Sequence, residues 1–91
     1  MDAITRYIRD NASKSHPICS SQLMKRFDTS GVAIRHMINA ARSNGDPICS
    51  SGRGYYVAYG KDEIQQTIDS LRGRIAVMNR AIDGLERSLT M

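Results

Sequence analysis

The sequence predicts an α+β fold, in which three short helices and a small sheet precede one long C-terminal helix. Apolar residues recur at helical spacing in three short segments before residue 45. Two β-prone runs flank a Gly-rich turn between residues 46 and 59. From residue 62 onward the apolar residues follow an unbroken heptad pattern. We therefore divide the 91 residues into a domain over 1–60 and a helix over 61–91.

The chain begins with a predicted helix over residues 3–11, for which Asp2 is the N-cap. Its apolar residues have the i, i+3, i+4 spacing of one helical face: Ile4, Tyr7 and Ile8. A short polar loop follows. Residues 16–19 come next and are too few for anything but a small strand.

A second and a third helix are predicted close together. The second covers residues 22–27, with Ser20 and Ser21 offering its cap. Residues 28–29 leave only a tight turn before the third helix, which extends from the N-cap Ser30 to Gly45. Its buried stripe consists of Ile34, Ile38 and Ala41, with Met37 beside them. Two helices joined by so few residues favour a helix-turn-helix.

The other face of the third helix carries long hydrogen-bond donors and no carboxylate: Arg35, His36, Asn39 and Arg42. An ordinary surface helix usually shows charges of both signs, so this face is a candidate for a DNA groove. Arginine suits guanine and asparagine suits adenine in the major groove. We expect Arg35, His36 and Asn39 at base edges and Arg42 at a phosphate.

Residues 46–59 predict a β-hairpin whose turn contains Gly52, Arg53 and Gly54. Pro47 cannot donate to a ladder, so the first strand begins there or lies at a sheet edge. Arg53 extends into solvent near the tip. The order helix, strand, helix, helix, strand, strand is that of a winged helix, with the hairpin as its wing.

Residues 20–59 resemble the N-terminal winged helix-turn-helix of the biotin operon repressor family. In that family a Ser-x-x-x-Ile-x-x-x-Ile recognition helix ends in Gly and leads to a wing with a Gly-Lys/Arg-Gly-Tyr motif. The matching positions are Ser30, Ile34, Ile38, Gly45, Gly52, Arg53, Gly54 and Tyr55. The turn departs from the usual Leu-Gly-hydrophobic-Ser, and no biotin-ligase domain follows. The resemblance therefore implies only DNA binding, and the predicted DNA-binding residues are Ser30, Gly31, Arg35, His36, Asn39, Arg42 and Arg53.

The net charge of +4 lies entirely in the first two-thirds of the chain. Residues 1–60 hold eight Lys/Arg and four acidic residues, whereas residues 61–91 hold five of each. This distribution favours a polyanion-facing domain joined to a neutral element. The sequence shows no signal peptide or membrane-spanning run, and we expect a cytoplasmic protein with no membrane partner.

The segment Pro-Ile-Cys-Ser-Ser occurs twice, at residues 17–21 and 47–51, and both copies are interpreted as strand entries. The expected sheet order places Cys19 and Cys49 roughly 9–10 Å apart, beyond the reach of a disulfide. We expect reduced, buried thiols. A zinc site from these cysteines with His16 and His36 is disfavoured by the ligand spacing. We expect no metal or cofactor.

The C-terminal helix has apolar residues at steps of 4 and 3 without a miss. This pattern predicts a coiled-coil seam that joins copies of the chain. The alternative is a helix folded back on its own domain. The seam residues are Ile64, Ile68, Leu71, Ile75, Met78, Ile82, Leu85 and Leu89.

The sequence predicts no enzyme, since it shows no nucleophile elbow, phosphate loop or carboxylate pair in a plausible cleft. We expect sequence-specific double-stranded DNA binding by a dimer or higher oligomer. Such a protein would be a small transcriptional regulator, of a size that suits a phage or mobile element. The alternative is a winged-helix interaction or assembly module whose coiled coil is the functional surface, since this fold does not by itself imply DNA binding.

Overall fold

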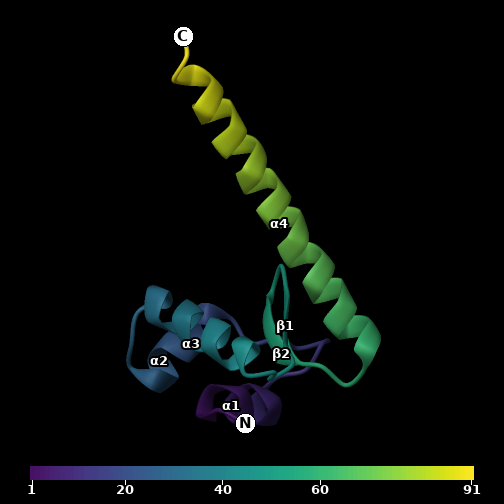
Figure 1. Cartoon of the computed structure of the whole chain (residues 1–91). Coiled ribbons are helices and arrows are strands. Elements are labelled where there is room, and N and C mark those ends of the chain that lie inside the picture. Colours follow the sequence, from purple (N-terminus) through teal and green to yellow (C-terminus); the bar gives the residue numbers. More distant parts are fainter.

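A computed structural model describes residues 1–91 and shows four helices and one β-hairpin (Figure 1). The strands β1 (Ile48–Ser51) and β2 (Gly54–Val57) are antiparallel. The predicted α+β class is confirmed, as is the long C-terminal helix. The helices are α1 (Ala3–Asn11), α2 (Ser20–Phe27), α3 (Gly31–Ser43) and α4 (Lys61–Ser88).

The ends of α3 are where the sequence predicts them. The Ser30 hydroxyl accepts a hydrogen bond from the Ala33 N–H at 3.1 Å, which satisfies one donor of the first turn. Beyond the other end, Gly45 has a φ of +94°, a left-handed conformation that favours glycine. Asp28, in the turn between α2 and α3, is the only non-glycine residue with a positive φ, 49°. Aspartate tolerates this conformation better than most residues.

Two predictions for residues 16–22 are wrong in detail. The helix α2 begins at Ser20 rather than Gln22, and Cys19 rather than the serine pair is its N-cap residue. The side chain of Gln22 accepts a hydrogen bond from the Cys19 N–H at 3.1 Å, which fixes this earlier start. The predicted strand is reduced to a single β-bridge between Ile18 and Tyr55, because the chain turns into α2 directly after Cys19.

The hairpin has a two-residue turn, Gly52-Arg53, between the paired residues Ser51 and Gly54. Because Ile18 pairs with Tyr55, β2 lies between Ile18 and β1, in the expected order. The strand β1 begins directly after Pro47, where the missing N–H of proline costs the ladder nothing.

The core lies between the first three helices and one face of the hairpin. Its buried residues are Ile4, Ile8, Ile18, Leu23, Ile34, Ile38, Ala41 and Ile48. The predicted inward stripe of α3 is therefore confirmed.

One carboxylate fixes the start of α1 to the α3–β1 connection. Asp2 occupies the N-cap position of α1, but its side chain makes no cap hydrogen bond. Instead the Asp46 carboxylate accepts from the Thr5 hydroxyl at 2.7 Å and from the Asp2 N–H at 3.0 Å. These bonds hold the pKa of Asp46 below its usual value.

The first turns of α4 pack against β1. Cys49 and Tyr56, which are opposite each other in the hairpin, are buried but lie outside the core cluster. Thr67 of α4 is also buried, and its hydroxyl lies 3.4 Å from the Ser50 N–H, which donates to it. Beyond these turns α4 extends away from the rest of the chain, and the molecule measures 53 Å along its greatest dimension (Figure 1). Neither α4 nor any other helix combines the length and apolarity needed to cross a bilayer.

Candidate nucleic-acid interface

The outer face of α3 presents unpaired polar side chains. Arg35, His36 and Asn39 are exposed, and none of their side chains makes a hydrogen bond or ion pair within the chain. Val32, an apolar residue outside the predicted DNA-binding set, is 54% exposed and lies one turn before Arg35 and His36. The helix contains no acidic residue. This face is thus free to donate hydrogen bonds to an external partner.

The beginning of α3 is shaped by Ser30 and Gly31. The Ser30 side chain is occupied by its capping bond, so its role is to fix the helix start. A Cβ added at Gly31 would lie 3.7 Å from the Met24 sulfur and 4.0 Å from a guanidinium nitrogen of Arg35. The Arg35 side chain therefore leans back over the first turn of the helix.

Arg42 differs from Arg35, His36 and Asn39, because it is half-buried. Its Nε donates to the Ile48 carbonyl at 2.8 Å, and one terminal nitrogen donates to the Ser50 hydroxyl at 3.3 Å. Burial is the main cause that lowers the pKa of Arg42; Tyr55 and Cys49 oppose this shift, and the positive charge of Arg74 adds a smaller lowering effect. Arg42 thus joins α3 to β1 while its charge stays without a carboxylate partner.

The hairpin tip exposes Arg53, as predicted from its position between glycines. The Arg53 backbone N–H donates to the Ser51 hydroxyl at 3.2 Å, which leaves the guanidinium free. Gly54 has a φ of +147°, and a Cβ there would overlap the carbonyl of Ile18. Glycine is therefore required at Gly54, whereas a Cβ at Gly52 would meet open space.

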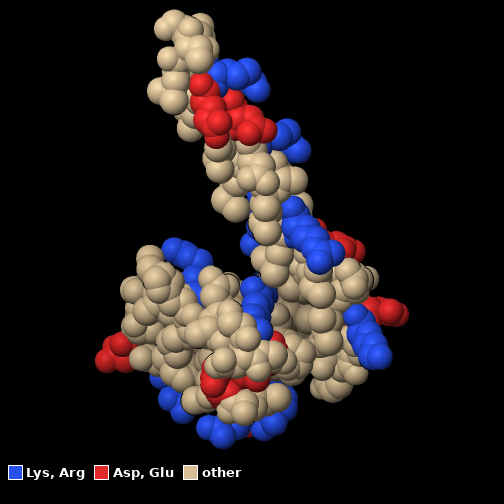
Figure 2. All heavy atoms as spheres, in the orientation of Figure 1, with Lys and Arg blue, Asp and Glu red and all other residues tan.

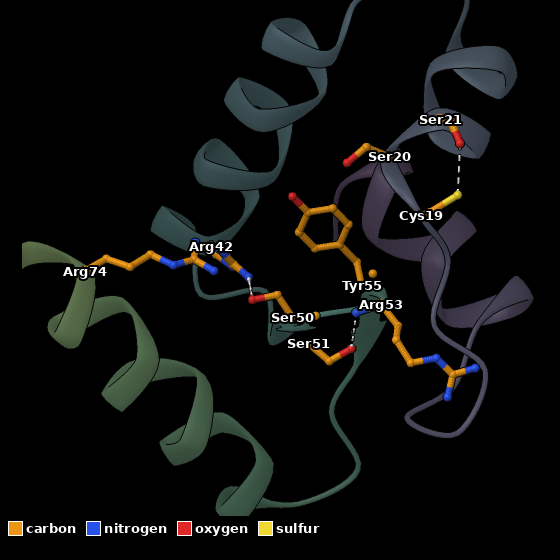
Figure 3. A pocket seen from close by; sticks show the side chains of 11 residues that line it. Cys19, Ser20, Ser21, Arg42, Ser50, Ser51, Arg53, Tyr55 and Arg74 are labelled. Carbon is orange, nitrogen blue, oxygen red and sulfur yellow. Dashed lines mark hydrogen bonds between the residues drawn. The ribbon is translucent and has the colours of Figure 1, made fainter.

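An open hollow of about 420 Å³ lies between α2, the end of α3, the hairpin and α4 (Figure 3). We call it the arginine hollow. Its principal charged and hydroxyl groups belong to Ser20, Arg42, Ser50, Arg53, Tyr55 and Arg74, and no carboxylate lines it. Figure 3 shows the Arg42 and Arg74 side chains pointing toward each other, whereas Arg53 points away from both.

The predicted seam of α4 divides into two segments. In the packed segment (residues 64–71), Ile64, Ile68 and Leu71 are half-buried and line one groove together with Ile48 and Cys49. In the projecting segment (residues 75–89), the five seam residues are 49–84% exposed. They are Ile75, Met78, Ile82, Leu85 and Leu89.

Both cysteines are free thiols. Cys49 is buried as expected, but Cys19 is partly exposed, so the prediction of burial is wrong there. As the N-cap of α2, Cys19 has its sulfur 3.0 Å from the Ser21 hydroxyl at the protein surface. That hydrogen bond and the backbone of Gln22 lower the pKa of the Cys19 thiol. No three His, Cys, Asp or Glu side chains are grouped so that they could hold a metal ion.

Donor groups thus stand on three elements: the face of α3, the hairpin tip and the side of α4 above the hairpin. Figure 2 shows basic atoms where α4 rises past the hairpin and acidic atoms farther along α4. Comparisons with family models, with curated proteins and with solved structures returned no match for this chain.

Proposed function

We propose that this protein binds double-stranded DNA in a sequence-specific manner as a small transcriptional regulator. The observation that carries the proposal is the outer face of α3, which is exposed, acid-free and internally unpaired. The helix order and the hairpin fit a winged helix similar to that of the biotin operon repressor family. In this assignment α2 and α3 form the helix-turn-helix, and the hairpin is the wing.

A major groove is wide enough to admit one α-helix, and α3 has the side chains to use it. Arg35 and Asn39 are one turn apart on the same stripe, so both reach one line of base edges. His36 and Val32 flank that stripe. Val32 offers an apolar contact to a thymine methyl group, which the polar residues cannot supply.

Arg53 at the hairpin tip is suited to a phosphate or to the adjacent minor groove. Its guanidinium is free and exposed, and Gly54 fixes the strand beside it against Ile18. The wing would therefore set the position of the protein on the duplex, while α3 supplies the discrimination.

We further propose that two copies associate through the projecting segment of α4. The packed segment is half-buried and faces β1, so the proposed seam is shorter than the eight residues that the sequence predicts. It spans two heptads, about 21 Å at a rise of ~1.5 Å per residue. A symmetric pair presents two α3 helices and would bind two half-sites of an inverted repeat.

The test uses a duplex that the parent protein enriches from a random pool, together with its single-base variants. Arg35→Ala should lose ~1–3 kcal/mol of discrimination at one base position. Arg53→Ala should instead weaken binding to all these duplexes and lower the salt slope by about one unit per protomer. Arg6→Ala, in α1, removes the same charge outside the proposed interface and serves as the control. If Arg35→Ala weakened all duplexes equally, the base-reading role of α3 would be wrong.

The alternative function is that of an interaction or assembly module, and the exposed apolar residues of the projecting segment favour it. In that case the basic face is incidental, since +4 is a modest charge. The two functions differ in retention on DNA as salt rises. A specific DNA-binding protein keeps a preferred duplex at salt that releases random duplexes, whereas an assembly module releases both together.

A further inference from the structure

The arginine hollow places two guanidinium groups side by side without a counter-charge. Arg42 is held by Ile48 and Ser50, and the positive charge of Arg74 is near enough to oppose its own. Neither arginine forms an ion pair within the chain. Arg42 is half-buried and Arg74 is exposed, so the repulsion falls chiefly on Arg42, and an anion bound between the two guanidinium groups would relieve it.

The remaining groups of the hollow suit an oxyanion. The hydroxyls of Ser20, Ser50 and Tyr55 line it alongside the two arginines. In Figure 3 the Tyr55 ring stands between the end of α3 and the start of α2, where Ser20 lies. Arginine and hydroxyl donors arranged around an open, acid-free space recognise phosphate in particular, because guanidinium groups match its geometry.

We propose that the arginine hollow is a phosphate site, held chiefly by Arg42 and Arg74, and that it takes a backbone phosphate of the bound DNA. This inference rests on the proposed function for the source of the phosphate. Arg42 lies seven residues after Arg35 and three after Asn39, on the same stripe of α3. A duplex lying along that stripe therefore passes the hollow at its C-terminal end.

The site makes α4 part of the DNA interface, which neither the heptad pattern nor the family resemblance indicates. Arg74 reaches the hollow from the turn of α4 that follows the packed segment. Because the packed segment fixes the start of α4 on β1, the phosphate contact depends on that packing. Phosphate contacts of this kind position a protein on DNA and carry no sequence information directly.

Arg74→Gln tests the site, and Arg72→Gln is the matched control, since Arg72 is exposed on the same helix and does not line the hollow. On an enriched duplex, Arg74→Gln should lower the salt slope by about one unit per protomer and weaken binding alike for all base variants. Arg72→Gln should leave the slope unchanged. An unchanged slope for Arg74→Gln, or an equal loss for both variants, would overturn the proposal.

A second measurement separates this site from the proposed function. Inorganic phosphate, compared with chloride at equal ionic strength, should raise the Tm of the parent and of Arg72→Gln more than that of Arg74→Gln. If the parent binds no DNA but its Tm rises with phosphate as described, the proposed DNA-binding function is wrong. The hollow is then still a phosphate site, and its phosphate comes from another ligand. If Tm responds equally in all three proteins, the hollow is not a phosphate site.

Discussion

The two segments of the α4 stripe have the same heptad spacing and different surroundings. In the packed segment, Ile64, Ile68 and Leu71 lie against β1, and Thr67 accepts a hydrogen bond from Ser50. In the projecting segment, Ile75 and Ile82 are about half exposed, and this part of α4 extends away from the rest of the chain (Figure 1). The same heptad spacing thus places the apolar residues of the packed segment beside β1, whereas those of the projecting segment are largely exposed.

This difference shows that a heptad pattern predicts which face of a helix is apolar, and not what covers it. The fold-back interpretation of the sequence therefore applies to one segment of the helix only. The fold-back interpretation describes residues 64–71, where the stripe is half-buried and faces β1. Self-association remains a proposal for residues 75–89, where apolar side chains face solvent at a spacing suited to a second helix.

The largest expected effect comes from a charge in the projecting segment. Ile75→Asp places an unpaired carboxylate in the proposed seam and should dissociate the protein while residues 1–71 stay folded. DNA affinity should then fall by roughly 10²–10⁴-fold, because the second half-site is no longer bound intramolecularly. Light scattering and titration with the enriched duplex measure the two changes.

Ala76→Asp is the control for this substitution, since Ala76 is exposed and lies outside the stripe. It should remain associated and bind as the parent does. A monomeric Ile75→Asp that binds DNA as tightly as the parent would disconnect the projecting segment from DNA binding. The segment would then serve another partner.

A substitution in the packed segment should have a smaller effect, and it should change the stability of the fold rather than self-association. Ile68→Asp should destabilise the fold by about 1–3 kcal/mol, since it replaces a half-buried apolar side chain facing β1. Urea unfolding followed by tyrosine fluorescence suits this test, because all four tyrosines lie within residues 1–60. Gln66→Asp, on the exposed side of the same turns, should leave the midpoint near that of the parent. Equal midpoints for the two variants would mean that this segment does not support the hairpin.

The smallest expected effect is a gain in stability from Gly84→Ala. A Cβ at Gly84 would meet only a guanidinium nitrogen of Arg87, at 3.8 Å, and the position is helical. Alanine should therefore stabilise the projecting helix by about 1 kcal/mol. Thermal unfolding by circular dichroism should show a higher Tm for the associated protein. A lower Tm would mean that another copy packs closely against this glycine.

Much of the local structure could be predicted from the sequence, because caps and periodicity act over a few residues. Ser30 and Gly45 mark the ends of α3, and the glycines around Arg53 mark the hairpin turn. The start of α2 at Ser20 is not evident from the sequence, because cysteine is an uncommon N-cap and its hydrogen bond with Gln22 depends on the folded backbone.

The candidate site was less predictable from the sequence, since tertiary contacts determine where its side chains lie. Arg42 follows the pattern of an outward residue, yet β1 lies close enough to take its hydrogen bonds. Arg74 gave no signal at all in the sequence, because its place beside Arg42 depends on how α4 packs against the hairpin. Contacts between residues this far apart in the chain are set by packing rather than by local pattern.

Selection of bound sites from a pool of random duplexes, with the full-length parent protein, tests the central claim most directly. A dimer of DNA-binding domains predicts an enriched inverted repeat, with half-sites about one helical turn, or a multiple of it, apart. An enriched single half-site would contradict association through α4, and the absence of any enriched sequence would contradict specific DNA binding.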